Sequence, residues 1–131
     1  MKIYWDSSAL VEAVLNKEIR DRLRQDDACT RLHSLSEIFS TLTGGRLGFR
    51  VNPADAAELV EDLCQDMDVV RLDSDAVRAA LGNARRMGVR GGRVHDYLHA
   101  VAAIRKSCAS IRTLNQRDFE GLCEGMGIVG P

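Results

Sequence analysis

Five side chains, spread over the whole chain, could together bind a metal ion. Asp6 follows a short apolar run, Glu37 and Asp96 each open an apolar stretch, and Asn115 and Asp118 lie near the C-terminus. Carboxylates that a fold brings together repel one another unless a cation lies between them. Hard cations such as Mg²⁺ and Mn²⁺ prefer oxygen ligands. The pattern therefore predicts a magnesium or manganese site.

The elements expected around these side chains alternate between strand and helix. Strands are predicted over residues 3–5, 29–33, 69–72, 110–113 and 126–129, and apolar residues with helical spacing lie between them. Such alternation indicates an α/β fold with a mostly parallel sheet that is covered by helices on both faces. Ligands of such sheets bind beyond the carboxyl ends of the strands. Asp6 and Asn115 are expected there, and Glu37 and Asp96 in the first turns of neighbouring helices.

The bulk properties fit one domain over residues 1–131 and exclude several classes of protein. The formal net charge is −1, so no global basic field indicates a nucleic-acid partner. No apolar run reaches the roughly 18 residues that a membrane span needs. The short apolar N-terminus ends at Asp6 and does not read as a signal peptide, so we expect a cytoplasmic protein without membrane contact. The four cysteines are widely spaced and are expected to be free.

Each acid also has a purely structural interpretation. Asp6 could end a strand and cap the next helix. Ser34-Leu35-Ser36-Glu37 has the spacing of a capping box, in which the glutamate reaches back to the cap. Asp96 could be favoured only by the helix dipole, and Asp118 could be a loop or cap residue. These interpretations are independent of one another, whereas a metal site accounts for all the acids together.

Two further clusters leave alternatives open. His95 and His99 are one helical turn apart, a spacing that can bind zinc, but no H-E-x-x-H motif is present. We therefore expect His99 to pack or to hydrogen-bond near the site. A glycine-rich segment before Asp96 carries four arginines, namely Arg85, Arg86, Arg90 and Arg93. They could contact phosphates or form a solvated charged loop.

Four segments together resemble one protein family. Residues 3–10 read Ile-Tyr-Trp-Asp-Ser-Ser-Ala-Leu, residues 35–38 read Leu-Ser-Glu-Ile, residues 95–103 begin His-Asp-Tyr-Leu-His, and residues 111–119 read Ile-Arg-Thr-Leu-Asn-Gln-Arg-Asp-Phe. In this order, they resemble the motifs of PIN-domain nucleases, especially the VapC-type ribonuclease toxins. Many PIN domains have Asp where this chain has Asn115. The toxin-like members often have Asn there and Asp three residues later, as here.

The resemblance implies a three-layer α/β/α sandwich and a metal-dependent endoribonuclease. Asp6, Glu37 and Asp96 would bind Mg²⁺ or Mn²⁺, Asn115 or Asp118 would complete the site, and Ser7 and Thr113 would hydrogen-bond to the acids or to metal-bound water. It further implies RNA as substrate, products with a 5′-phosphate, a cognate antitoxin protein and a homodimer. Two alternatives remain at this point: an RNA-processing nuclease without a toxin role, and a catalytically silent PIN fold used for binding.

Overall fold

The computed structural model describes all residues 1–131 and contains one five-stranded parallel sheet with the strand order β3-β2-β1-β4-β5. The strands are β1 (Lys2–Trp5), β2 (Asp27–Arg31), β3 (Asp68–Val70), β4 (Ser110–Arg112) and β5 (Gly127–Val129). The helices are α1 (Ser7–Leu15), α2 (Lys17–Gln25), α3 (His33–Thr43), α4 (Pro53–Cys64), α5 (Ser74–Asn83), α6 (Arg93–Arg105) and α7 (Gln116–Phe119). None of the helices combines the length and the hydrophobicity that crossing a membrane requires.

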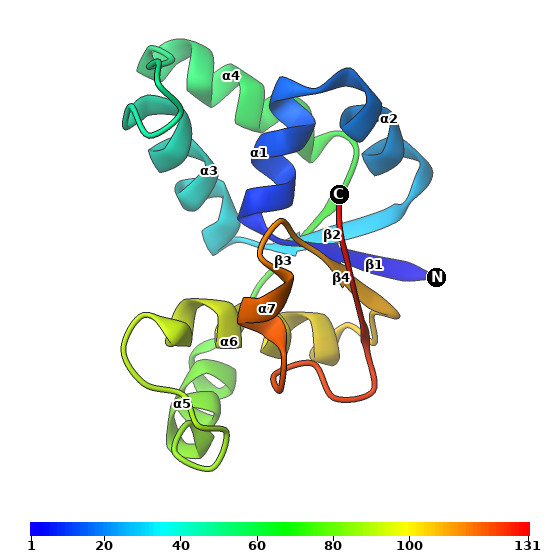
Figure 1. The fold of residues 1–131 in the computed structure, drawn as a ribbon, viewed down its shortest axis with the longest axis vertical. Coiled ribbons are helices and arrows are strands. Elements are labelled where there is room, and N and C mark those ends of the chain that lie inside the picture. The colour runs from blue at the N-terminus through cyan, green and yellow to red at the C-terminus, as the bar shows by residue number, and fades with distance from the viewer.

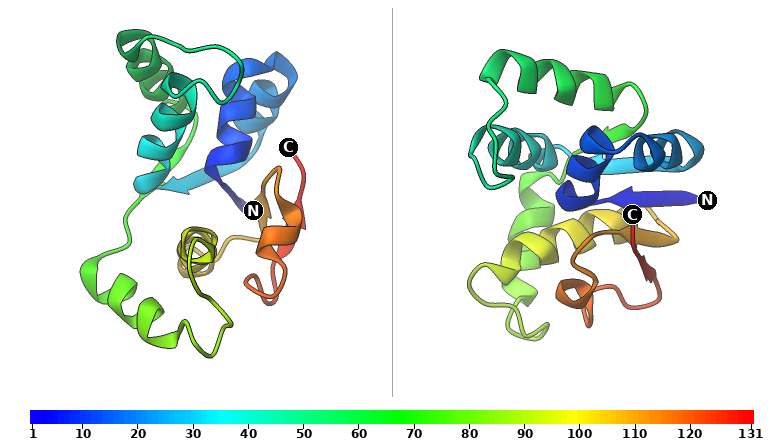
Figure 2. Two further views of the ribbon diagram at one scale, coloured as in Figure 1. Left: turned by 60° about the vertical axis from the view of Figure 1, so that its left-hand side comes forward. Right: turned by 45° about the horizontal axis from the view of Figure 1, so that its top comes forward.

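The sheet is the middle of three layers. Side chains alternate between the faces of a strand, so Tyr4 packs into one core while its neighbour Trp5 packs into the other. The core around Trp5 lies under α1 to α4, and the core around Tyr4 lies under α5, α6 and α7 (Figures 1 and 2). The predicted α/β/α sandwich with a parallel sheet is confirmed.

Polar residues at the helix starts explain where several helices begin. Asp6, Asn52 and Asp73 each accept a hydrogen bond from a backbone N–H of the first turn that follows. Pro53 occupies the first position of α4, where its missing N–H has no partner to lose. At the other end of the chain, the short helix α7 ends at Phe119. Gly121 and Gly125 follow it with φ of +82° and +77°, which only glycine adopts easily.

The start of α3 differs from the predicted capping box, which is wrong. The helix begins at His33, and its N-cap Leu32 provides no side-chain hydrogen bond. Ser34 is buried inside the first turn, and its Oγ accepts a hydrogen bond of 2.7 Å from Thr30 on β2. The Glu37 side chain is consequently free to interact away from its own helix.

The strand order places the candidate acids at a particular edge of the sheet. From β1 the chain first builds β2 and β3 on one side, and it later returns to place β4 on the other side of β1. Adjacent parallel strands whose connections leave in opposite directions form a switch point, where α/β proteins bind ligands. Asp6 follows β1, and Thr113 and Asn115 follow β4, so all three lie at this point.

Candidate active site

A network of short hydrogen bonds fixes the buried carboxylate of Asp6. Its Oδ1 accepts bonds from the Ser8 hydroxyl (2.6 Å) and the Ala9 backbone N–H (3.0 Å), and its Oδ2 accepts a bond of 2.6 Å from the Thr113 hydroxyl. The serine that orients Asp6 is therefore Ser8, whereas the sequence analysis assigned this role to Ser7. An ionised carboxyl group has about four acceptor sites, so three bonds leave about one for a further partner.

The same two hydroxyl groups tie the β4–α7 loop to Asp6. The Ser8 hydroxyl oxygen accepts a hydrogen bond from the Leu114 N–H, and the Thr113 hydroxyl oxygen accepts one from the Asn115 N–H, both of 3.0 Å. The ends of β1 and β4 thus form one rigid unit although about a hundred residues separate them in sequence. Asn115 itself is exposed at the start of α7.

Asp96 and Asp118 bring further negative charge to this unit. Asp96 lies in the first turn of α6, and Asp118 lies on the exposed helix α7. Burial, followed by the charges of Asp118 and Asp6, raises the pKa of the Asp96 carboxyl group. The charges of Asp118 and Asp6 therefore oppose ionisation of the Asp96 carboxyl group, and a nearby cation would offset this effect.

Glu37 has a different environment, because positive groups surround it. Burial favours its neutral form, but a hydrogen bond from His99 and the nearby charges of His99, His33 and Arg31 outweigh burial and lower the pKa of Glu37. The carboxylate can only accept, so Nε2 of His99 donates the 2.9 Å bond to Glu37 Oε1.

The imidazole of His99 is in turn oriented by Tyr4. The Tyr4 hydroxyl group lies 2.6 Å from His99 Nδ1 and accepts a bond of 3.1 Å from the Arg31 N–H. Burial raises the pKa of Tyr4, so its proton stays available for donation to Nδ1. With both nitrogens engaged, His99 has no lone pair for zinc. The histidine was expected to hydrogen-bond near the site, but its buried link through Tyr4 is not visible in the sequence.

A cavity of about 540 Å³ opens beside these groups. It is lined by hydroxyl, amide and charged side chains, including Ser7, Ser8, Glu37, Arg46 and Asn115. Arg46 was not anticipated as a site residue. The only signal in the sequence is its position directly after the Gly44-Gly45 pair that ends α3. Its exposed guanidinium group forms no ion pair within the protein and is free to contact an anion in the cavity.

The arginines before Asp96 have different roles from one another. Arg93 opens α6 and donates hydrogen bonds to the backbone carbonyls of Asp118 and Glu120 (3.2 and 2.9 Å). It thereby fixes the loop that carries Asp118. Arg85, Arg86 and Arg90 are exposed and line none of the cavities of the protein. For Arg93 the structure supports a structural role, and for the other three it favours the solvated loop.

A known protein family matches nearly the whole chain. The family model of the PIN domain matches residues 3–124, which include all the predicted acids. The chain belongs to the PIN domain family. No curated protein sequence matches this PIN domain.

Solved structures agree with the fold. One is VapBC2 from Rickettsia felis bound to a DNA fragment from its promoter, with a TM-score of 0.69 and 12% identity over 99% of this chain and 98% of the other. Another is VapBC-1 from nontypeable Haemophilus influenzae, with a TM-score of 0.66 and 16% identity over 98% of this chain and 96% of the other. At these identities the similarity establishes a shared fold across the whole domain.

The donor set of this PIN domain suits a hard divalent cation. Asp6 retains acceptor capacity, and the repulsion that raises the pKa of Asp96 would be offset by a positive charge between the acids. As the side chains lie, no three His, Cys, Asp or Glu residues are close enough together to hold a metal ion. The ligand chemistry therefore fits Mg²⁺ or Mn²⁺, whereas the finished coordination shell is not preformed.

Proposed function

We propose that this PIN domain is a metal-dependent endoribonuclease and the toxin of a type II toxin–antitoxin pair. The observation that carries the proposal is the Asp6 carboxylate of this PIN domain, which three hydrogen bonds fix at the switch point of the sheet. The charges of Asp118 and Asp6 disfavour the ionised form of Asp96, and a cation between these acids would relieve that effect. A phosphodiester is itself negative, so a cation at these acids would offset their repulsion of the reacting phosphate.

In this proposal each acid has a stated task. Asp6, Glu37 and Asp96 would hold Mg²⁺ or Mn²⁺, with Asn115 or Asp118 completing the site. The cation, when bound, would supply an activated water and offset charge on the phosphoryl oxygens.

The remaining polar groups keep these acids in place. Ser8, Thr113 and the Ala9 N–H fix both oxygens of Asp6, so the carboxylate keeps one orientation as a cation or substrate enters. His99 does the same for one oxygen of Glu37. Because these donors belong to α1, to α6 and to the segment that follows β4, the site depends on correct packing of both layers of helices.

Two further elements of the proposal rest on similarity. The motif resemblance to VapC-type toxins and the fold shared with the two VapBC structures support a cognate antitoxin as partner. The same resemblance supports a cytoplasmic location and a homodimer. Arg46, which lines the 540 Å³ cavity and forms no ion pair, supports an anionic substrate.

The nuclease is tested with purified protein, Mn²⁺ and single-stranded RNA. Wild type should cleave RNA only with the metal. Saturating Mn²⁺, at about 100 times its dissociation constant, should stabilise the protein by about 2.7 kcal/mol. Asp96→Asn should lose both effects. Asp75→Asn changes an exposed aspartate on α5 and should retain both. No cleavage and no metal-dependent stabilisation of wild type would refute the proposal and favour a silent binding module.

The toxin role needs a separate test in cells. Induced expression of wild type should arrest growth, and Asp96→Asn should relieve the arrest at equal protein levels. Co-expression of a neighbouring small open reading frame should also relieve it if that frame encodes the antitoxin. Equal arrest by wild type and Asp96→Asn would contradict a toxic nuclease activity, whereas cleavage without arrest would indicate an RNA-processing enzyme.

A further inference from the structure

A second cavity, of about 600 Å³, lies at the carboxyl ends of β2 and β3. Arg31 ends β2, and Arg71 and Leu72 follow β3; the first turns of α3 contribute Leu32, His33 and Leu35. We call this the β2–β3 pocket. Its volume is typical of a small-ligand site, and it occupies the edge of the sheet where α/β proteins bind ligands.

The β2–β3 pocket continues into the 540 Å³ cavity that Glu37 lines. His33 and Ser36 line both, so one surface leads from Arg71 past His33 to Glu37. A chain whose reacting bond lay at the acids could therefore extend into the pocket.

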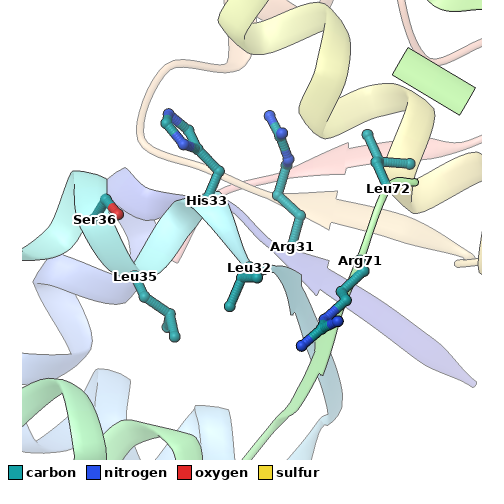
Figure 3. Close-up of a pocket in the computed structure, with 7 residues that line it drawn as sticks. All are labelled: Arg31, Leu32, His33, Leu35, Ser36, Arg71 and Leu72. Carbon is teal, nitrogen blue, oxygen red and sulfur yellow. The ribbon is translucent and has the colours of Figure 1, made fainter. Parts of the chain in front are cut away.

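The β2–β3 pocket is positively charged, and no acidic side chain of the protein pairs with its arginines. Arg31 and Arg71 form no ion pair and no side-chain hydrogen bond, whereas Arg20 and Arg112 are each bound to an aspartate. No acidic residue lines the pocket. Figure 3 shows Arg31 and His33 projecting to one side of the β2–α3 junction and Arg71 projecting to the other. Two separated guanidinium groups suit two separate phosphates better than a single one.

The pocket also offers apolar surface between these charges. Leu32 is 46% exposed, and Leu35 and Leu72 are half-buried. Aliphatic side chains beside arginines match a nucleotide, which combines a charged backbone with a flat base. The few aromatic residues of the chain lie elsewhere, so the base would rest on leucine and on the His33 ring.

We propose that the β2–β3 pocket binds the nucleotide next to the scissile bond of a single-stranded RNA, with Arg31 and Arg71 on its flanking phosphates. This inference rests on the proposed nuclease function and names where the substrate runs beyond the acids. It assigns RNA contacts to arginines on β2 and β3 rather than to the loop before Asp96.

The test measures binding without cleavage. A labelled, mixed-sequence, single-stranded RNA is titrated with the full chain in chelator, and fluorescence anisotropy gives Kd at several salt concentrations. Arg31→Gln and Arg71→Gln should each weaken binding by about fivefold to tenfold. Each should lower the slope of log K against log salt by about 0.7, the value for one lost phosphate contact on a single strand. Arg78→Gln, an exposed arginine on α5 without partners, should change neither.

The outcomes separate this inference from the nuclease proposal. Unchanged affinity and slope in both arginine variants, or no RNA binding by wild type, would overturn the pocket. So would arginine variants that bind RNA normally but lose affinity for a Glu-rich peptide, because the pocket would then serve a protein partner. Arg31→Lys keeps the charge and should retain the slope, which guards against a folding defect in Arg31→Gln. RNA binding that depends on these arginines, without Mn²⁺-dependent cleavage, would support the RNA-binding pocket and refute the nuclease proposal.

Discussion

Replacing Tyr4 by Phe tests the buried link from Tyr4 through His99 to Glu37. The hydroxyl group lies 2.6 Å from His99 Nδ1 and accepts a hydrogen bond of 3.1 Å from the Arg31 N–H. The ring is fully buried, so phenylalanine keeps the packing and water cannot replace the lost group. The substitution therefore removes two hydrogen bonds and no apolar contact.

The expected cost follows from the two partners left behind. A buried donor or acceptor without a partner costs about 1–3 kcal/mol, and Tyr4→Phe leaves one of each. Some relaxation of the imidazole is expected, so we predict a loss of about 2–4 kcal/mol in the free energy of unfolding. Domains of this size are stabilised by about 5–15 kcal/mol, so the variant should still fold.

Urea unfolding of wild type, Tyr4→Phe, His99→Leu and the double variant measures the link directly. The slope m should stay constant, because the exposed surface hardly changes. Groups in contact couple by about 0.5–3 kcal/mol, so Tyr4→Phe should cost clearly less once His99 is leucine. If the two single effects add within about 0.5 kcal/mol, Tyr4 does not act through His99 and the reasoning fails.

Three further changes address the acids. Asp96→Asn should not lower the free energy of unfolding of the metal-free protein, measured by urea at pH 7. Burial and the charges of Asp118 and Asp6 raise the pKa of Asp96, so its ionised form opposes folding. A loss of stability would contradict this reasoning. Thr113→Val should cost about 1–3 kcal/mol by removing the hydroxyl bonded to Asp6, and Thr113→Ser should restore most of it. The lowered pKa of Glu37 stabilises the fold above about pH 4.5, and this stability is lost as pH falls through that pKa. The stability difference between wild type and Glu37→Gln should therefore narrow in acid melts, and a constant difference would refute it.

The sequence predicted much of the fold because local signals and global packing agree. The caps at Asn52 and Asp73, the apolar spacing of α4 and α5 and the β-prone runs of β1, β3 and β4 all have local causes. The start of α3 lacked such a cause, since Ser34 turns inward to Thr30 on a neighbouring strand. No local sequence rule predicts this contact, and because of it Ser34 does not form the predicted capping box.

The sequence indicated which acids are candidates for the site, but it did not indicate what orients them. Ser7 and Ser8 are adjacent in sequence, and only the phase of α1 decides that Ser8 reaches Asp6. Tyr4 and His99 are 95 positions apart, so their contact depends on the docking of α6 under β1. Arg93 carries a charge suited to phosphate, but in the folded protein its guanidinium group donates to the backbone carbonyl of Asp118. The sequence does not reveal this contact.

Asp6 joins two tasks in a single side chain, since it caps α1 through the Ala9 N–H and belongs to the proposed metal ligands. Survivors of a genetic selection against the proposed toxin would therefore arise at this codon in two ways. Alanine would loosen the helix start as well as remove the charge, and such alleles would be depleted from the soluble pool. Asparagine caps helices about as well as aspartate, so it would keep the bond to the Ala9 N–H, but its amide nitrogen cannot accept the Thr113 hydroxyl, so the tie between α1 and the segment after β4 would loosen.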